Sequence, residues 1–414
     1  MEELKPFRKC VQDAWTSKGL PHTENVYDGE INGLTHCCDS IYHGKRSGSW
    51  YFVKDKPNVT IFSGAMSKQL IIDAASRVAK GVTVIHGESE LHFYATREVI
   101  VSQGVFESPK LLMLSGIGPK DHLESHGIKT ILDSPHVGQN LIDHPGVPFV
   151  LQVKDGYGMD SVLLRSGPRQ EAAMARYKKD GSGPVGSGLL ELVGFPRIDD
   201  YLEKDKLYKE RKAANGGKDP FAPQGQPHFE LDFVSMFGSA FQWHYPTPKK
   251  GDYVTVVVDL VRPVSPPGEL TLRSDDPLVQ PDINLNFFAD DLDIVGMREG
   301  IRFTYDLLTK CEGFKDIVVS EFPWEMPLDS DKEMHRAVLD RCQTAFHPTG
   351  TARLSKSIEQ GVVDPHLKVH GIKNLRVMDA SVIPIIPDCR IQNSVYMVGE
   401  KGADMLKTAH ADLY

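Results

Sequence analysis

The sequence predicts an α/β fold, α+β overall, because two distant stretches each read as strand, loop and helix. The first has a strand at Glu98–Ser102, a glycine, and a helix at Ser108–Ser115. The second has a strand at Asn374–Asp379, a proline-bounded loop, and a helix at Ser394–Leu406 with apolar residues at helical spacing. Between them, alternating apolar runs such as Tyr253–Leu260 are typical of a largely antiparallel sheet.

The first hundred residues add an amphipathic helix and a set of strands. A helix is expected at Lys5–Lys18, because Phe7, Val11, Ala14 and Trp15 fall on one face. Short apolar runs separated by glycine-containing turns predict further strands at Val59–Phe62, Gln69–Ile72, Val82–Ile85 and Leu91–Tyr94.

Composition narrows the class of protein. A chain of 414 residues suggests two or three structural domains. The net charge of −9, without a long Lys/Arg run, argues against a nucleic-acid partner, and a small-molecule substrate is expected instead. The six cysteines have no metal-type spacing, so no metal site is expected. No apolar run reaches the ~18 residues of a membrane span, and the charged start MEELKPFRKC is unlike a signal peptide, so a cytoplasmic protein is expected.

Two long motifs carry a family resemblance. The segment from Phe346 to Lys407 places the turn His347-Pro348-Thr349-Gly350 before the second strand–loop–helix unit. It resembles the C-terminal signature of the glucose-methanol-choline (GMC) flavoprotein oxidoreductases, and its last loops look most like the aryl-alcohol-type branch. The stretch from Gly104 to Pro119 resembles the internal signature of the same family.

The resemblance implies a domain plan and a cofactor, FAD. Residues 1–148 would form the remaining part of an FAD-binding α/β domain with an entrance helix and loop. Residues 149–345 would form a substrate-binding domain, a largely antiparallel sheet backed by helices. Residues 346–414 would return to close the FAD domain and carry the catalytic motif.

The expected phosphate-binding motif is not found in its usual context. Dinucleotide-binding folds open with a strand, G-x-G-x-x-G and a helix. The one literal match, Gly181–Gly186, follows the polar run Tyr177–Asp180 and contains Pro184, so it is interpreted as a loop. The FAD domain is therefore predicted to be incomplete. Three explanations stay open: an N-terminally truncated sequence, a short family member without FAD, or a chain completed by another chain; a homodimer is a further option.

The resemblance also implies catalytic positions. Alcohol oxidation needs a hydride acceptor and a base, and a neutral imidazole suits the proton step. His347 matches the family's catalytic histidine, although a turn-capping histidine is the plainer alternative. Counting back from the last helix places Arg390 at the second position, with Asn393 as the alternative. Arginine cannot act as a base, but it can stabilise an alkoxide or bind an anionic substrate.

Eight further residues match family positions near FAD. Asp379 and Ala380 match the phosphate–ribose region, and Ser394 and Val395 match a helix start that faces the ring. Asn140, Asp143 and His144 match a segment beside the flavin, where structural roles are an equal alternative. Met66 matches a position near the adenine.

The resulting hypothesis is oxidation of a CH–OH group of a hydrophobic or aromatic alcohol, with hydride transfer to FAD and His347 as base. Phe237, Phe241, Trp243 and Tyr245 could line such a pocket, though core packing explains aromatic residues equally well. The alternatives are a FAD-free cyclase, lyase or isomerase that uses His347 and Arg390, and a truncated chain without catalysis.

Overall fold

The computed structural model describes residues 2–24, 26, 29–240 and 245–413. The chain divides into two compact units, each assembled from three segments. Unit 1 comprises Met1–Val59, Pro145–Val264 and Asp290–Ala345, and unit 2 comprises Thr60–His144, Ser265–Ala289 and Phe346–Tyr414. The domain roles expected from the sequence stay predictions, because these units are defined by contacts alone. Among the described residues, no helix has the length and apolar character to cross a membrane.

Unit 1 is built on a seven-stranded sheet in which every pair of strands is antiparallel. The order is β1-β12-β13-β14-β11-β17, and β18 also pairs with β11. The central strand β14 is buried at every position, including Asp252, Thr255 and Asp259. The strands are β1 (Gly33–His36), β11 (Pro145–Val153), β12 (Leu192–Phe195), β13 (Phe229–Val234), β14 (Asp252–Leu260), β17 (Val318–Phe322) and β18 (Gln343–Thr344), with a separate hairpin of β2 (Ile41–Tyr42) and β3 (Lys45–Arg46).

Helices back this sheet, and small residues let them approach closely. A Cβ added at Gly300 of α9 would lie 2.5 Å from the ring of Phe229 in β13. A Cβ at Gly194 of β12 would lie 2.5 Å from the ring of Trp15 in α1. The helices of unit 1 are α1 (Lys5–Ser17), α2 (Trp50–Val53), α5 (Asp160–Leu163), α6 (Pro168–Asp180), η2 (Pro184–Gly186), α7 (Asp199–Leu202), α8 (Lys206–Ala214), α9 (Asp291–Thr309) and α10 (Asp331–Arg341).

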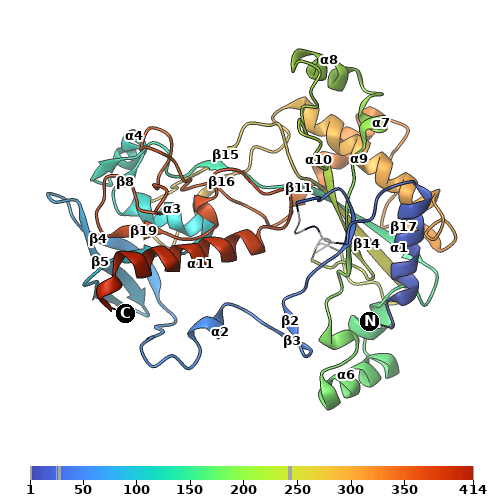
Figure 1. The fold of residues 1–414 in the computed structure, drawn as a ribbon, viewed down its shortest axis with the longest axis horizontal. Coiled ribbons are helices and arrows are strands. Elements are labelled where there is room, and N and C mark those ends of the chain that lie inside the picture. Colours follow the sequence, from blue (N-terminus) through green and yellow to red (C-terminus); the bar gives the residue numbers. More distant parts are fainter. Residues whose placement is uncertain (1, 25, 27–28, 241–244, 414) are drawn as a thin grey trace. The chain divides into compact units, whose positions relative to one another are not determined.

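Unit 2 combines two parallel strand pairs, β7 with β19 and β8 with β9, with small antiparallel sheets (Figure 1). The parallel strands β7 (Val99–Val101) and β19 (Leu375–Val377) pair along their whole length, and α3 (Gly104–Leu114) follows β7. Its other elements are β4 (Met66–Asp73), β5 (Val78–His86), β6 (Ser89–Tyr94), β8 (Ile117–Gly118), α4 (Lys120–Ser125), β9 (Leu132–Asp133), β10 (Gln139–Leu141), β15 (Gly268–Thr271), β16 (Asp282–Asn284), η3 (Ala380–Val382), α11 (Gln392–Ala409) and η4 (Ala411–Leu413).

The mixed α/β class with antiparallel sheets and helices is therefore confirmed. Two local predictions were wrong. The run Val59–Phe62 forms no strand. The helix predicted from Ser108 starts at Gly104, so that Pro109 lies inside it. Proline cannot bond to the carbonyl four residues earlier, and the freed oxygen of Val105 instead accepts a 2.5 Å hydrogen bond from the Thr351 hydroxyl.

Candidate active site

Two segments of unit 2 that are about two hundred residues apart in sequence lie side by side and form the candidate site. The backbone N–H of Ile142 donates to the oxygen of Thr349 at 3.1 Å, and the N–H of Thr349 donates back to Ile142 at 2.8 Å. Gly350 permits this approach: its φ is +97°, and a Cβ there would lie 2.2 Å from the carbonyl oxygen of Asn140. The close approach of the Asn140 carbonyl therefore requires a glycine at this position of the His-Pro-Thr-Gly turn.

Asp143 ties the two histidines of the site together through their backbones. One oxygen, Oδ1, accepts from the N–H of His144 at 2.8 Å and from the N–H of His347 at 3.0 Å. The side chain is 2% exposed. A carboxylate forms strong, charge-assisted hydrogen bonds with backbone N–H groups. Asp143 therefore holds the backbones of both residues in place.

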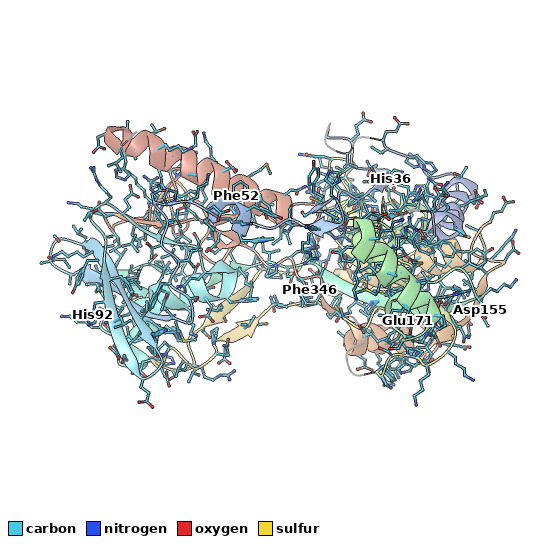
Figure 2. The ribbon with its side chains drawn as sticks, turned by 90° about the horizontal axis from the view of Figure 1, so that it is seen from below. His36, Phe52, His92, Asp155, Glu171 and Phe346 are labelled. Carbon is cyan, nitrogen blue, oxygen red and sulfur yellow. The ribbon has the colours of Figure 1, made fainter. Side chains whose placement is uncertain are left out.

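The two imidazole rings meet edge to face. Nδ1 of His144 lies 3.1 Å from Nδ1 of His347, and the ring centres are 5.3 Å apart with an angle of 82° between the planes. His144 is fully buried, and His347 is 9% exposed although its neighbour Phe346, labelled in Figure 2, is 60% exposed. The turn therefore directs Phe346 outward and His347 inward.

Burial controls the charge of His347. Burial, the larger cause, and the positive charge of Arg390 together lower the pKa of His347 from 6.5 to about 4. His347 is therefore neutral at neutral pH, which a general base requires.

Of the two alternatives for the second position, Arg390 carries a charge that acts on the pKa of His347, and the choice between Arg390 and Asn393 stays a prediction. Arg390 is half-buried in the loop between η3 and α11, whereas Asn393 is exposed in the first turn of α11.

Asp379 lies at the carboxyl end of β19, where its carboxylate is occupied by protein donors. Oδ2 accepts from the N–H of Gly104 at 3.0 Å and from the Ser108 hydroxyl at 2.5 Å, and Oδ1 accepts from the N–H of Ser381 at 2.8 Å. Asp379 thus joins the start of α3 to the start of η3, where Ala380 is buried. The role of Ser108 was missed, because its acceptor is 271 residues away in sequence.

The remaining predicted cofactor residues lie on several elements of unit 2. Ser394 and Val395 are half-buried in the first turns of α11, the long red helix in Figure 1. Met66 begins β4, where it pairs with Ile85. Asn140 has φ +67°, which fits the tight contact with Gly350. No measurement of a bound ligand tests these assignments, and they stay predictions.

The described residues fit the ring end of a flavin better than its pyrophosphate end. The N-terminus of α11 presents backbone N–H groups that favour electron-rich oxygens, and Arg390 precedes it. At the other end, Gly181–Gly186 closes α6: Gly181 is its left-handed C-cap, with φ +74°. A helix therefore precedes these glycines, so they do not form a strand–loop–helix phosphate cradle. In the described part of the chain, the fit to FAD is limited to the ring end.

Comparison with known proteins identifies the class. The chain belongs to the GMC oxidoreductase family, whose two models match residues 2–146 and 263–399. The family resemblance predicted from the two motifs is thereby confirmed.

Individual relatives differ in what they act on. Formate oxidase of Aspergillus oryzae RIB40, in a structure concerned with how an arginine-to-lysine mutation affects FAD modification, is 73% identical with a TM-score of 0.99. This chain is covered completely and that chain to 72%. Oxygen-dependent choline dehydrogenase of Burkholderia ambifaria is 29% identical, with 98% of this chain and 67% of the relative covered. The chain thus spans about two thirds of that curated relative.

The aryl-alcohol-type branch predicted from the last loops has weaker support. A fungal aryl-alcohol oxidase is 22% identical, covering 97% of this chain and 70% of that one, with a TM-score of 0.80. At this identity the likeness shows a shared fold only.

Proposed function

We propose that the protein oxidises formate, a small carboxylate, by transferring its hydride to FAD. The observation that carries this proposal is a buried, neutral His347 whose pKa is lowered in part by the positive charge of Arg390. Support comes from the 73% identity to formate oxidase over the whole of this chain. Membership of a family of FAD-dependent oxidoreductases supports the redox chemistry.

A carboxylate substrate explains why arginine, and not a second base, stands at this position. The guanidinium fork can bind both oxygens of formate through charge-assisted hydrogen bonds. Oxidation of formic acid releases a single acidic proton, for which His347 is the acceptor, so no second proton acceptor is needed. The C–H bond breaks, its electron pair leaves with the hydrogen as hydride, and the remaining atoms depart as CO₂. FAD, when bound, supplies the hydride acceptor.

His347 has a defined role in this reaction. If formic acid enters the site, the neutral imidazole accepts its proton and leaves formate on Arg390. Burial and the charge of Arg390 keep the pKa of His347 at about 4, so the ring is neutral at neutral pH and has a lone pair for this proton. The arginine also provides a reason for the mutations made in the relative: Arg390 is our proposed counterpart of the arginine changed there to lysine or alanine.

A hydrophobic or aromatic alcohol is the second candidate. Of the four aromatic residues suggested to line its pocket, Phe237 is fully buried against Tyr253 and Phe322, which favours core packing. Tyr245 packs against Trp324, and Phe241 and Trp243 lie outside the described residues. The family's redox chemistry also makes a FAD-free cyclase, lyase or isomerase the weaker alternative.

The test is an absorption spectrum followed by anaerobic reduction. The purified 414-residue chain, with FAD added and with the upstream segment of a relative supplied in a parallel sample, should become yellow in at least one condition. Formate should then bleach the flavin band, and benzyl alcohol should not. Bleaching by benzyl alcohol alone would favour the second candidate, and a colourless protein that turns over a substrate would favour the FAD-free alternative.

A further inference from the structure

The contact between His144 and His347 has a chemical consequence beyond packing. Both rings are buried, and their Nδ1 atoms are 3.1 Å apart, which is a hydrogen-bond distance. Two neutral imidazoles can share this contact only if one Nδ1 carries a proton and the other presents its lone pair. The contact therefore couples the tautomers of the two rings.

The two possible arrangements differ in what His347 can do. If His144 donates, then His347 carries its single proton on Nε2 and cannot accept another proton there. If His347 donates from Nδ1, its Nε2 keeps a lone pair and can act as a base. Since the hydrogen bond at one ring nitrogen sets the state of the other, the role of His144 decides whether His347 can act.

We infer that His144 is a positioning residue: it accepts the Nδ1–H of His347 and thereby keeps Nε2 of His347 unprotonated for catalysis. This inference rests on the proposed role of His347 as base. His144 itself need not contact substrate, because it acts through the second ring.

The surrounding groups support this arrangement. Asp143 accepts from the backbone N–H of both residues through Oδ1, so the two backbones from which the rings project are held together. The positive charge of Arg390 acts on His347, whose Nδ1 edge is already occupied by His144. A cation favours the tautomer whose lone pair faces it. Among the described residues, Nε2 of His347 has no hydrogen-bond partner, which leaves it available to a substrate.

Nitrogen NMR of the full chain labelled with ¹⁵N-histidine tests the inference without any cofactor. His347→Gln identifies the signals of His347 by their loss. At neutral pH, the wild-type ring should show a protonated Nδ1 and an unprotonated Nε2. A wild-type ring with its proton on Nε2 would overturn the inference outright, whatever the variants do.

A matched pair of variants separates positioning from folding. His144→Asn places an amide oxygen near the former Nδ1 and should preserve the tautomer, whereas His144→Leu removes the acceptor and should give a mixture of tautomers. His370→Leu, a change at another histidine of unit 2 that bonds Ser355, should leave the His347 signals unchanged. An unchanged tautomer in folded His144→Leu would contradict the inference.

Kinetics of protein loaded with FAD provide a second readout. His144→Leu should lower the rate of flavin reduction by formate about 10- to 100-fold, the usual effect of losing an orienting partner, with KM little changed because Arg390 still binds the carboxylate. His144→Asn should recover most of the rate. If the wild-type tautomer is as inferred but formate never reduces the flavin, the positioning role stands and the proposed function fails.

Discussion

His228 in unit 1 and His347 in unit 2 are both buried histidines, but their ring nitrogens have different partners. Nδ1 of His228 accepts from the N–H of Ile198 at 2.9 Å, and its Nε2 lies 2.6 Å from Asp219. Arg197 approaches the same carboxylate oxygen at 3.1 Å. His347 has another imidazole at Nδ1, and in the described part of the chain Nε2 meets no hydrogen-bonding group.

This difference separates a structural histidine from a reactive one. Burial would raise the pKa of Asp219, but the hydrogen bond and charge of His228 and the N–H groups of Phe221 and Ala222 together lower it below its ordinary value. Both ring nitrogens of His228, and the carboxylate of Asp219, therefore have hydrogen-bond partners within the fold. His347 lacks a carboxylate at its ring, so burial keeps it neutral and able to accept a proton.

Substituting each of these two histidines in turn should give the largest difference in kcat and in stability. We expect His347→Gln to lower kcat for formate by ~10²–10⁴-fold, the usual contribution of a general acid or base, with little loss of stability. His228→Gln should lower the free energy of unfolding by about 1–3 kcal/mol because it leaves buried polar groups unpaired, with kcat of the folded protein unchanged. Stopped-flow reduction and denaturant titration measure the two effects. Similar profiles for the two variants would remove the distinction.

Removing the cation beside His347 should have the next largest effect. Arg390→Ala should lower kcat/KM for formate ~10²–10³-fold, because the substrate loses its charge-assisted partner. Arg390→Lys should retain part of this activity, since lysine keeps the charge but not the planar fork. Steady-state kinetics against Asn393→Ala provide the control. A larger loss in Asn393→Ala than in Arg390→Ala would favour the alternative that the sequence left open.

Acid should destabilise unit 2 through His347. Lowering its pKa from 6.5 to about 4 means that the unfolded state binds more protons between these values, so stability falls as pH falls through this range. The free energy of unfolding should fall by about 3 kcal/mol at most over this range, and the fall should be complete near pH 4. Urea titrations at several pH values should show a flatter dependence for His347→Gln than for the wild type. Parallel curves would show that His347 titrates normally.

The smallest effect is expected for Asp143, because its carboxylate bonds to the backbones of the two histidines and not to their rings. Asp143→Asn keeps an oxygen that can accept from His144 and His347, so the free energy of unfolding should fall by only about 1 kcal/mol. The pH dependence of flavin reduction should keep its wild-type form. A shifted pH profile in this variant would mean that the charge of Asp143 also tunes the imidazole pair.

Periodic patterns in the sequence were sufficient for the main elements. The apolar face of α1, the strand β14 and the amphipathic α11 all appear where they were predicted. The predicted start of α3 was wrong, since a distant carboxylate, Asp379, stabilises its true first residue, Gly104. Local rules assign Ser108 and Pro109 to a helix start, but they cannot include an acceptor on the far side of the fold.

The sequence by itself determined the family, the fold class and the candidate residues His347 and Arg390, because these are carried by continuous motifs and local periodicity. Only the tertiary structure decided that His144 meets His347 and that the positive charge of Arg390 acts on the pKa of His347. The physical reason is that hydrogen bonds between rings depend on the pairing of two segments 203 residues apart. Such pairing is set by packing and backbone register, which no local stretch of sequence encodes.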